Sequence, residues 1–515
     1  MPASFRVFCL LCTSALLAAC HSGDNNNDNP SESSQPQRGT LIQSPPPRTA
    51  SLSAAELAAA LGASEETQLL LQITGAPKCR VDVHYIQYNS IGAANEPATA
   101  SGALMVPAGT DAACTGSRPI LLYAHGTSTD KAFNIANVQD QENGEGLLMA
   151  LVFVSQGYIV VAPNYAGYDT SSLNYHPYLN AEQSANDMID ALAAARSALP
   201  TAEAPTTNAS EKLFVTGYSQ GGHVAMATHR ALQNAGTAVT ASAPMSGPYA
   251  LAAFGDAVFY GQVNGSAPIF LTMLATGYQR AYGNIYSQPT DMFEAAYAPG
   301  IESLLPSTVS RSELYSQGKL PPDALFDITP PDPAYAPYTP ATQPELFAPL
   351  FAQGFGTNHL ITNSYRLAYL QDAQANPDGA FPTTTTGAPA ATPQHPLRQA
   401  FKRNDLRGWT PTAPMLLCGG NEDPTVYFMN TQIMQASWAN TAVPVTVLDV
   451  DSDAASGDPY KNIKDNFEIA KQLVAARAVV QGASDGGTRA VLEAYHSTLV
   501  PPFCLAAVKG FFDAR

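Results

Sequence analysis

The segment Gly217-Tyr218-Ser219-Gln220-Gly221 places a serine between two glycines, directly after an apolar run at residues 212–216. A serine in this pattern sits in a strained turn between a strand and a helix, and the small residues on each side let the two elements approach closely. The turn exposes the serine hydroxyl above the sheet, where it can act as a nucleophile. The sequence therefore predicts Ser219 as a catalytic nucleophile.

A second segment, residues 482–486 around Ser484, has the same spacing of glycine and serine. A helical pattern that contains Lys471, Arg477 and Gln481 precedes it, whereas a nucleophile turn follows a buried strand. We therefore expect Ser484 to lie in a loop and to have no catalytic role.

A serine nucleophile needs a general base, and the base needs an acid that orients it. After a nucleophile turn of this kind, the acid and then the histidine follow along the chain. His496 comes after the last expected strand and just before an expected closing helix. We predict a loop at His496 and assign it as the base, whereas His395 lies in a proline-rich stretch and is set aside.

The acid is expected in the turn at residues 419–426, which follows the expected strand that ends at Cys418. A carboxylate in that turn would face the histidine, and Asp423 is the preferred acid. Two alternatives stay open: the neighbouring Glu422, and the cluster Asp449, Asp451 and Asp453 after the next strand.

The oxyanion that forms during acyl transfer needs backbone N–H donors from the residue after the nucleophile and from the loop after an earlier strand. These donors are Gln220 and Thr127, the latter in the run His125-Gly126-Thr127. A histidine before glycine is expected to order this loop, so His125 is not assigned as a base. No chemistry is expected from the remaining histidines weighed as candidates: His84, His223 and His229.

The composition restricts the partners of the chain. Its 515 residues include 25 Lys or Arg and 42 Asp or Glu, which gives a net charge of −17. Such an acidic chain has no sequence-independent attraction for phosphate backbones, so we expect no nucleic-acid partner. No H-E-x-x-H motif and no glycine-rich phosphate loop is present, so no metal ion and no cofactor is predicted.

Continuous apolar runs alternate with helical periodicity in the first half of the chain. Parallel strands give unbroken apolar runs because helices cover both faces of the sheet. The pattern predicts an α/β fold with a mostly parallel sheet flanked by helices. The expected strands are residues 80–88, 98–106, 119–124, 158–162, 212–216, 414–418 and 443–450, and the expected helices are 181–199, 222–235 and 504–512.

The alternation stops between residues 249 and 408, a stretch with proline-rich pieces. We interpret this stretch as an inserted, mainly helical cap. The expected division is therefore a first core part at 51–248, the cap at 249–408 and a second core part at 409–515.

The N-terminal residues are typical of a targeting segment. Arg6 precedes an apolar stretch at residues 7–19 that is too short to span a bilayer but fits a signal peptide. Leu17-Ala18-Ala19-Cys20 resembles a bacterial lipobox, so we predict a lipoprotein signal peptide at 1–19, lipidation of Cys20 and a flexible tether at 20–50. His21 after the cysteine favours the outer membrane of a bacterial cell envelope. An ordinary signal peptide with an incidental cysteine stays open.

Four cysteines remain after the leader and Cys20: Cys79, Cys114, Cys418 and Cys504. An even number in an oxidising compartment indicates two disulfides with three possible connectivities, although four buried thiols stay open. The expected strand order brings the end of one strand, Cys418, to the closing helix at Cys504. The same argument places Cys79 near Cys114 in an antiparallel pair of strands.

At this point the chain resembles the secretory-lipase branch of the α/β-hydrolases, the lipase A type. The resemblance rests on residues 217–222, on His125-Gly126-Thr127, on residues 162–168 with 176–179 downstream, and on Asp423-Pro424. It implies a cap between strands 6 and 7 and a serine esterase or lipase in which Ser219 attacks an ester carbonyl. Asn164 departs from relatives, which often carry Asp there.

Two other functions stay open on the same fold. Triad geometry alone does not separate amide from ester substrates, so a capped serine peptidase is one alternative. A non-catalytic surface binding lipoprotein is the other. The preferred interpretation is a lipid-anchored serine carboxylic-ester hydrolase whose partners are an ester with an apolar acyl or aromatic part and, through the N-terminal lipid, a membrane.

Overall fold

A computed structural model describes residues 36–61, 75–140, 144–202, 207–381, 387–442 and 444–515. The expected leader, the lipidation site Cys20 and the first part of the expected tether lie outside these residues.

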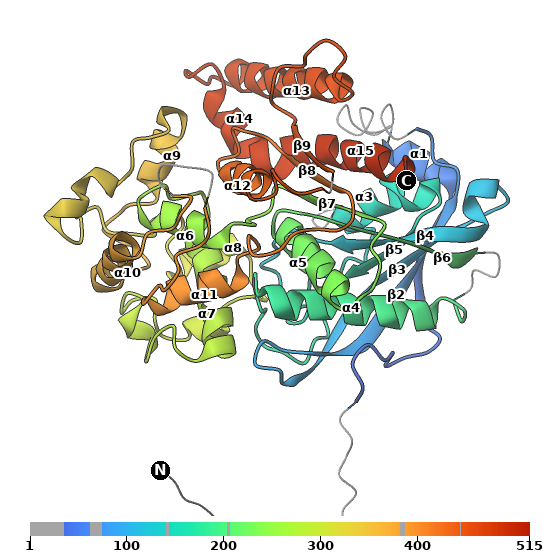
Figure 1. Cartoon of the computed structure of the whole chain (residues 1–515), viewed down its shortest axis with the longest axis horizontal. Helices are drawn as coiled ribbons and strands as arrows, with labels where there is room; N and C mark the ends of the chain where they lie inside the picture. Colours follow the sequence, from blue (N-terminus) through green and yellow to red (C-terminus); the bar gives the residue numbers. More distant parts are fainter. Residues whose placement is uncertain (1–35, 62–74, 141–143, 203–206, 382–386, 443) are drawn as a thin grey trace, which may run out of the picture. The chain divides into compact units, whose positions relative to one another are not determined.

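A single mixed sheet forms the centre of the described chain. Its strands follow the order β1-β2-β3-β5-β4-β6-β7-β8-β9, antiparallel from β1 to β5 and parallel from β5 to β9. The fold class is therefore the predicted one, a mostly parallel sheet flanked by helices (Figure 1). The strands are β1 (Arg48–Leu52), β2 (Arg80–Ile91), β3 (Pro97–Ala108), β4 (Gly116–Ala124), β5 (Ile159–Pro163), β6 (Thr207–Tyr218), β7 (Ala241–Met245), β8 (Met415–Gly419) and β9 (Val445–Asp449).

Helices cover both faces of this sheet. On one face α4 (Ala181–Ala198) and α5 (Gln220–Asn234) pack together, and on the other α3 (Glu145–Val152) packs against α15 (Val500–Asp513). The parallel strands are buried on both sides, as Leu121, Val160 and Val215 show. This burial explains their unbroken apolar runs. The other helices around the sheet are α1 (Ala54–Leu61), α12 (Met429–Ser437), α13 (Lys461–Val480) and α14 (Thr488–Ala494).

The C-terminal helix begins much earlier than expected. Helical structure is continuous from α14 through a π-helical turn, Tyr495–Leu499, into α15. By length and apolar composition alone, this stretch, residues 488–513, is the one described helix that could cross a membrane. Its large side chains, such as Tyr495, Phe503 and Phe512, are buried in the core under the sheet.

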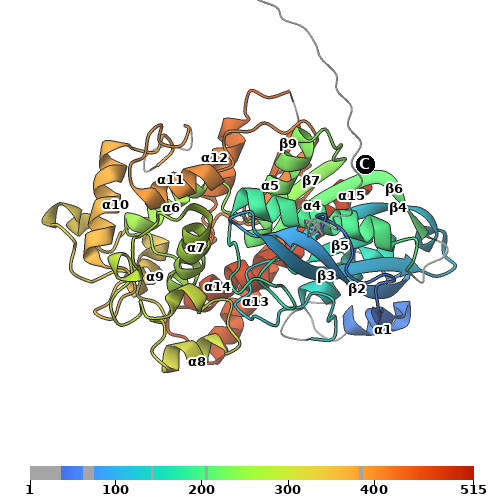
Figure 2. The same cartoon turned by 90° about the horizontal axis from the view of Figure 1, so that it is seen from below.

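The chain between β7 and β8 is mainly helical, and the insertion predicted at residues 249–408 falls within it. The strands β7 and β8 are the sixth and seventh strands of the chain if β1 is not counted. The sequence did not predict β1. Figure 2 shows the helices of the insertion gathered at one side of the sheet. They pack around an apolar core of their own, which includes Phe259, Tyr369 and Phe401. The insertion contains α6 (Leu251–Phe259), α7 (Ala267–Tyr282), α8 (Arg311–Ser316), α9 (Ala348–Gln353), α10 (Asn363–Ala375) and α11 (Pro396–Asn404).

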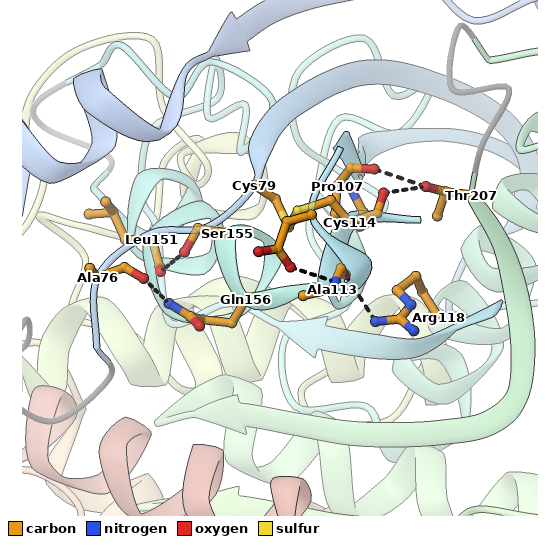
Figure 3. Close-up of a disulfide and its surroundings, with 11 residues drawn as sticks. Ala76, Cys79, Pro107, Ala113, Cys114, Arg118, Leu151, Ser155, Gln156 and Thr207 are labelled. Atoms are coloured by element: carbon orange, nitrogen blue, oxygen red, sulfur yellow. Dashed lines mark hydrogen bonds between the residues drawn. A yellow bond between two sulfur atoms is a disulfide. The ribbon is translucent and has the colours of Figure 1, made fainter. Parts of the chain in front are cut away.

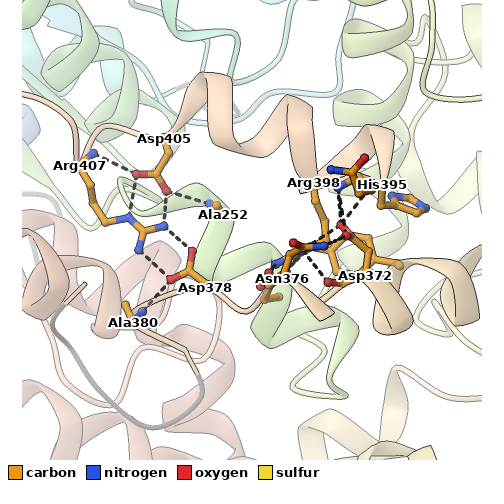
Figure 4. Close-up of polar contacts among 12 residues, drawn as sticks. Ala252, Asp372, Asn376, Asp378, Ala380, His395, Arg398, Asp405 and Arg407 are labelled. Atoms are coloured by element: carbon orange, nitrogen blue, oxygen red, sulfur yellow. Dashed lines mark hydrogen bonds and ion pairs between the residues drawn. The ribbon is translucent and has the colours of Figure 1, made fainter. Parts of the chain in front are cut away.

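Two buried arginines brace the end of the insertion (Figure 4). The Arg398 guanidinium lies 2.9 Å from both the Asp256 and the Asp372 carboxylates. Arg407 lies 2.7 Å from the Asp378 carboxylate and 2.8 Å from that of Asp405. Each guanidinium is shared by two carboxylates, which satisfies charges that would otherwise be costly to bury.

The expected tether is too long, because residues from Pro36 onward pack against the domain. The Arg38 side chain pairs with Asp190 at 3.0 Å, and the Gly39 N–H donates to the Asn89 carbonyl. Strand β1 then pairs with β2. Composition did not reveal this because the contacts are mainly backbone pairing and hydrogen bonds to residues distant in the sequence.

The structure pairs Cys79 with Cys114 and Cys418 with Cys504, as the expected strand order requires. Figure 3 shows the first disulfide beside Thr207, whose hydroxyl donates to the carbonyl of Cys114 at 3.1 Å. The second disulfide joins β8 to α15. Paired cysteines are typical of proteins outside the reducing cytoplasm.

Candidate active site

Ser219 lies in the turn between β6 and α5 with a backbone φ of 58°. A β-carbon at Gly217 would meet the Gly221 and Ala124 carbonyls, and one at Gly221 would meet the Ala124 carbonyl. Only glycine fits at these two positions because strand, turn and helix are in direct backbone contact. The local sequence thus forces a positive φ at the serine and presents its hydroxyl above the sheet.

Three side chains that are distant in the sequence form one hydrogen-bonded chain. His496 Nε2 lies 2.8 Å from Ser219 Oγ, and His496 Nδ1 lies 2.6 Å from Asp423 Oδ2. Asp423 is 1% exposed, and its other oxygen accepts hydrogen bonds from the backbone N–H groups of Thr425 and Val426 at 2.9 and 3.0 Å. The Asp423 carboxylate is therefore fixed toward the imidazole.

The prediction of a loop at His496 is wrong, because His496 lies in the π-helical turn between α14 and α15. Pro501 and Pro502 lie in the first turn of α15, where a missing N–H is tolerated, so they do not end the helical structure. The wider π turn displaces His496 from regular helical register. Such turns recur at functional sites because they reorient one side chain.

The alternative acids contact the Asp423 turn but not the histidine. Glu422 lies 3.9 Å from the Lys471 ammonium, and burial raises the pKa of the Glu422 carboxyl. The Asp449 carboxylate accepts from the backbone N–H and side chain of Asn421, and Asp451 pairs with Lys471. The side chain of Asp453, the last of these candidate acids, is exposed.

The expected oxyanion donors lie beside the turn that carries Ser219. Gln220 is the first residue of α5, and the first N–H groups of a helix have no partner within the helix. Thr127 follows β4, and a β-carbon on Gly221 would lie 2.8 Å from the His125 carbonyl. The loop that carries Thr127 therefore abuts the turn that carries Ser219.

The side chain of His125 is packed in the interior of the protein and hydrogen-bonded to backbone carbonyls. Its ring is fully buried between the rings of Phe133 and Tyr165, and its nitrogens contact the carbonyls of Gly126 and Asn164 at 2.6 and 3.1 Å. Burial lowers the pKa of His125 to about 4. Asn164 is also buried, and its amide oxygen accepts from the Ile135 N–H.

The other residues set aside lie away from this hydrogen-bonded chain. His223 and His229 both belong to α5, where His223 contacts the Asn404 carbonyl and His229 contacts Ser242 Oγ. Ser484 lies in an exposed turn after α13, a helix rather than a strand. The two remaining histidines are His84, buried on β2, and His395, buried at the start of α11.

Several solved structures are similar to this chain. The rice cell wall degrading esterase LipA from Xanthomonas oryzae superposes with a TM-score of 0.62 at 28% identity, over 85% of this chain and 96% of that one. A ligand-bound form of the same esterase gives 0.64 at 26% identity, over 93% and 100%. A Legionella pneumophila protein described as a hydrolase gives 0.60 at 20% identity over 80% and 91%, which shows the fold alone.

The chain is an α/β-hydrolase that resembles LipA-type esterases. The prolyl oligopeptidase family model also matches, over residues 148–266, which include the turn that carries Ser219 and the helix α6. No curated protein matched. Together these findings support hydrolase chemistry of the esterase type.

In this α/β-hydrolase an apolar cavity opens at Ser219 and Gln220. Its walls come from α6 and α7, whose lining residues repeat at helical spacing, which is typical of one apolar helix face. No lining side chain that the structure describes is charged. The principal apolar lining residues are Leu251, Phe254, Val258, Phe270, Leu271 and Leu274.

Apart from Ser219 and Gln220, sequence reasoning did not find the residues that line this cavity. The apolar pattern of α6 and α7 was visible, but which face would meet the nucleophile depends on how the insertion folds. Tyr178 was also missed, although it lies in the motif 176–179 that carries the family resemblance. Among the described residues, no cluster of His, Cys, Asp and Glu is placed to hold a metal ion.

Proposed function

We propose that this protein is a serine carboxylic-ester hydrolase, an esterase or lipase, that works through an acyl-enzyme. The observation that carries the proposal is the hydrogen-bonded chain Ser219, His496 and Asp423 at the mouth of an apolar cavity. A nucleophile, a base and an orienting acid in mutual hydrogen-bond contact are the arrangement that acyl transfer requires.

The steps follow from this geometry. Ser219 Oγ attacks the ester carbonyl while His496 Nε2 takes its proton, and the Asp423 carboxylate holds the imidazole in the required tautomer. The backbone N–H groups of Gln220 and Thr127 donate to the oxyanion. His496 then returns the proton to the leaving alcohol, and water releases the acyl group in the same way.

The cavity supports an ester with an apolar acyl or aromatic part as substrate. An uncharged wall of Leu, Phe and Val side chains gives no partner to a charged group, whose burial would be costly. The insertion, residues 249–408, supplies most of this wall. We therefore propose that it acts as a cap on the core formed by 51–248 and 409–515.

A serine peptidase is the second proposed function, because the prolyl oligopeptidase family model matches residues 148–266. The two functions are separated by comparing p-nitrophenyl esters with aminoacyl p-nitroanilides at equal concentration. An esterase gives a kcat/KM at least a hundredfold higher for the ester, with Ser219→Ala inactive on both. A higher kcat/KM for the anilide would support the peptidase.

A fluorophosphonate probe tests whether the site is catalytic at all. The probe phosphonylates an activated serine, so it should label the wild-type chain and not Ser219→Ala. Absence of labelling in both would support the non-catalytic binding lipoprotein.

We also propose that acyl chains on Cys20 anchor the protein to a bacterial envelope membrane, at the outer membrane. The lipobox supports this anchor, and the two disulfides agree with an extracytoplasmic location. Cys20→Ser should move the protein from the membrane fraction to the soluble fraction without loss of specific activity. A variant that still sediments with membranes would overturn the anchor.

A further inference from the structure

Three tyrosines from the segment after β5 contact the loop that carries Thr127. The phenols of Tyr165 and Tyr168 donate to the backbone carbonyls of residues 125 and 128, at 3.0 and 2.6 Å. The phenol oxygen of Tyr178 instead lies 2.8 Å from Thr127 Oγ1. The first two bonds fix backbone, whereas the third joins two hydroxyl groups.

Two hydroxyl groups carry two protons, and the hydrogen bond between the two groups uses only one of these protons. In the described part of the chain, neither Tyr178 nor Thr127 has another side-chain hydrogen bond. Burial raises the pKa of Tyr178 to about 12, so its phenol stays protonated. A phenol is a stronger acid than an aliphatic alcohol, so Tyr178 donates and the Thr127 hydroxyl keeps a proton for a further acceptor.

One member of this pair, Tyr178, reaches the cavity at Ser219. Tyr178 lines the cavity together with Ser219 and Gln220. Its ring is 5% exposed and is held between Phe270, parallel at 6.5 Å, and the edge of His176 at 6.0 Å. The phenol oxygen is therefore fixed, and it fixes the orientation of the Thr127 hydroxyl.

We propose that the Thr127 hydroxyl, oriented by Tyr178, is a third donor to the oxyanion, an inference that rests on the proposed esterase function. As Ser219 Oγ bonds to the carbonyl carbon, its proton passes to His496 and the π electron pair moves to the carbonyl oxygen. The Thr127 O–H donates to that negative oxygen. When the C=O bond re-forms and the alcohol leaves, the donor returns to its resting state. Thr127 is thus a catalytic residue and Tyr178 a positioning residue.

The first test replaces the hydroxyl alone. Thr127→Val keeps the backbone N–H and the branched shape, and it should lower kcat about 10- to 100-fold, as for loss of one oxyanion donor. KM should stay within about threefold, because the donor acts on charge that develops in the transition state. Thr127→Ser keeps the hydroxyl and should retain kcat within about threefold.

A tetrahedral inhibitor gives a second readout that a structural role would not move. An alkyl trifluoromethyl ketone forms a hemiketal oxyanion with Ser219, so its affinity for Thr127→Val should fall by the same factor as kcat/KM.

Tyr178 should act only through Thr127. Tyr178→Phe is expected to lower kcat about 3- to 10-fold, and adding it to Thr127→Val should lower kcat no further. The matched control is Tyr168→Phe, which removes a phenol that bonds only backbone in the same loop. It should lower the melting temperature and leave kcat within about threefold.

The proposal is overturned if Thr127→Val retains kcat within threefold, if the two losses add, or if Tyr168→Phe lowers kcat as much as Tyr178→Phe does. Ser219→Ala in the same assay separates a failure of the third donor from a failure of the proposed esterase function. If Ser219→Ala is inactive while Thr127→Val is fully active, only the third donor fails. If Ser219→Ala is active, the proposed function fails and the third donor fails with it.

Discussion

The Tyr218 phenol donates a hydrogen bond of 2.6 Å to the backbone carbonyl of His496. Tyr218 immediately precedes Ser219, and its ring lies 5.1 Å from the imidazole of His496. The residue before the proposed nucleophile therefore holds the backbone of the proposed base. This bond satisfies a carbonyl of the π turn and couples the nucleophile turn to the helix after it.

Tyr218→Phe should lower kcat about 3- to 10-fold because the π turn at His496 loses one of its restraints. A single buried hydrogen bond contributes about 1 kcal/mol to stability, so the melting temperature should fall slightly. The control is Tyr158→Phe, which removes a phenol that donates to Asp513 far from the site. It should change the melting temperature similarly and leave kcat unchanged; an equal loss of kcat in both variants would refute the coupling.

Asp423→Asn should lower kcat roughly 10³- to 10⁴-fold, because an amide in place of the carboxylate no longer fixes the imidazole tautomer that accepts the serine proton. Glu422→Gln is the matched control from the adjacent position, where the side chain faces Lys471. It should retain kcat within about threefold. Steady-state kinetics on a p-nitrophenyl ester measure both variants, and a larger loss in Glu422→Gln would reassign the acid.

The two disulfides should differ in their effect on activity. Cys418 leads into the Asp423 turn and is bonded to Cys504 of the helix that follows His496, a separation of 86 residues. Removing this bond should lower stability by up to about 4 to 5 kcal/mol and also lower kcat. Cys79→Ser opens a 35-residue separation outside the site and should lower mainly stability.

Thermal unfolding and kinetics of Cys418→Ser and Cys79→Ser measure this difference, and peptide mapping without reduction checks the pairing. Equal losses of kcat in the two variants, or a peptide linking Cys79 to Cys418, would contradict the assignment.

Buried histidines should make stability depend on pH, and His229 gives the simplest case. It contacts Ser242 Oγ, and burial lowers its pKa to about 4. Below pH 6.5 the unfolded chain binds a proton at this histidine while the folded chain does not, so this contribution to stability falls as pH falls from about 6.5 to 4. The slope is at most about 1.4 kcal/mol per pH unit.

The measurement is the free energy of unfolding of wild type and His229→Gln at several pH values. The advantage of wild type over the variant should shrink as the pH falls through this window. A difference that stays constant would show that His229 titrates normally in the folded protein.

The sequence predicted the elements whose signal is local. Buried strands such as β5 and β6 appear as apolar runs, and glycines 217 and 221 mark a turn that only glycine permits. It missed β7, because its residues, Ala241–Met245, are small and include a proline. It also missed the helical continuity at His496, because two prolines in a first helical turn resemble the end of a helix.

The parts that depend on distant contacts could not be predicted. Strand β1 and the chain before it are held by backbone pairing with β2 and by Asp190. The insertion is held by buried arginines such as Arg407, whose partners come from separate segments. The apolar cavity exists only once α6 and α7 have packed together, so its lining residues follow from the fold rather than from a motif.

The most direct test of the central claim is the kcat of Ser219→Ala beside that of Ser484→Ala on a p-nitrophenyl ester. Both serines lie in the same short motif, but only Ser219 follows a strand and contacts His496. The account predicts that Ser219→Ala loses several powers of ten in kcat, to the residual given by binding and oxyanion donors. It also predicts that Ser484→Ala stays within twofold of wild type. A Ser219→Ala protein that keeps a tenth of the wild-type kcat would contradict it.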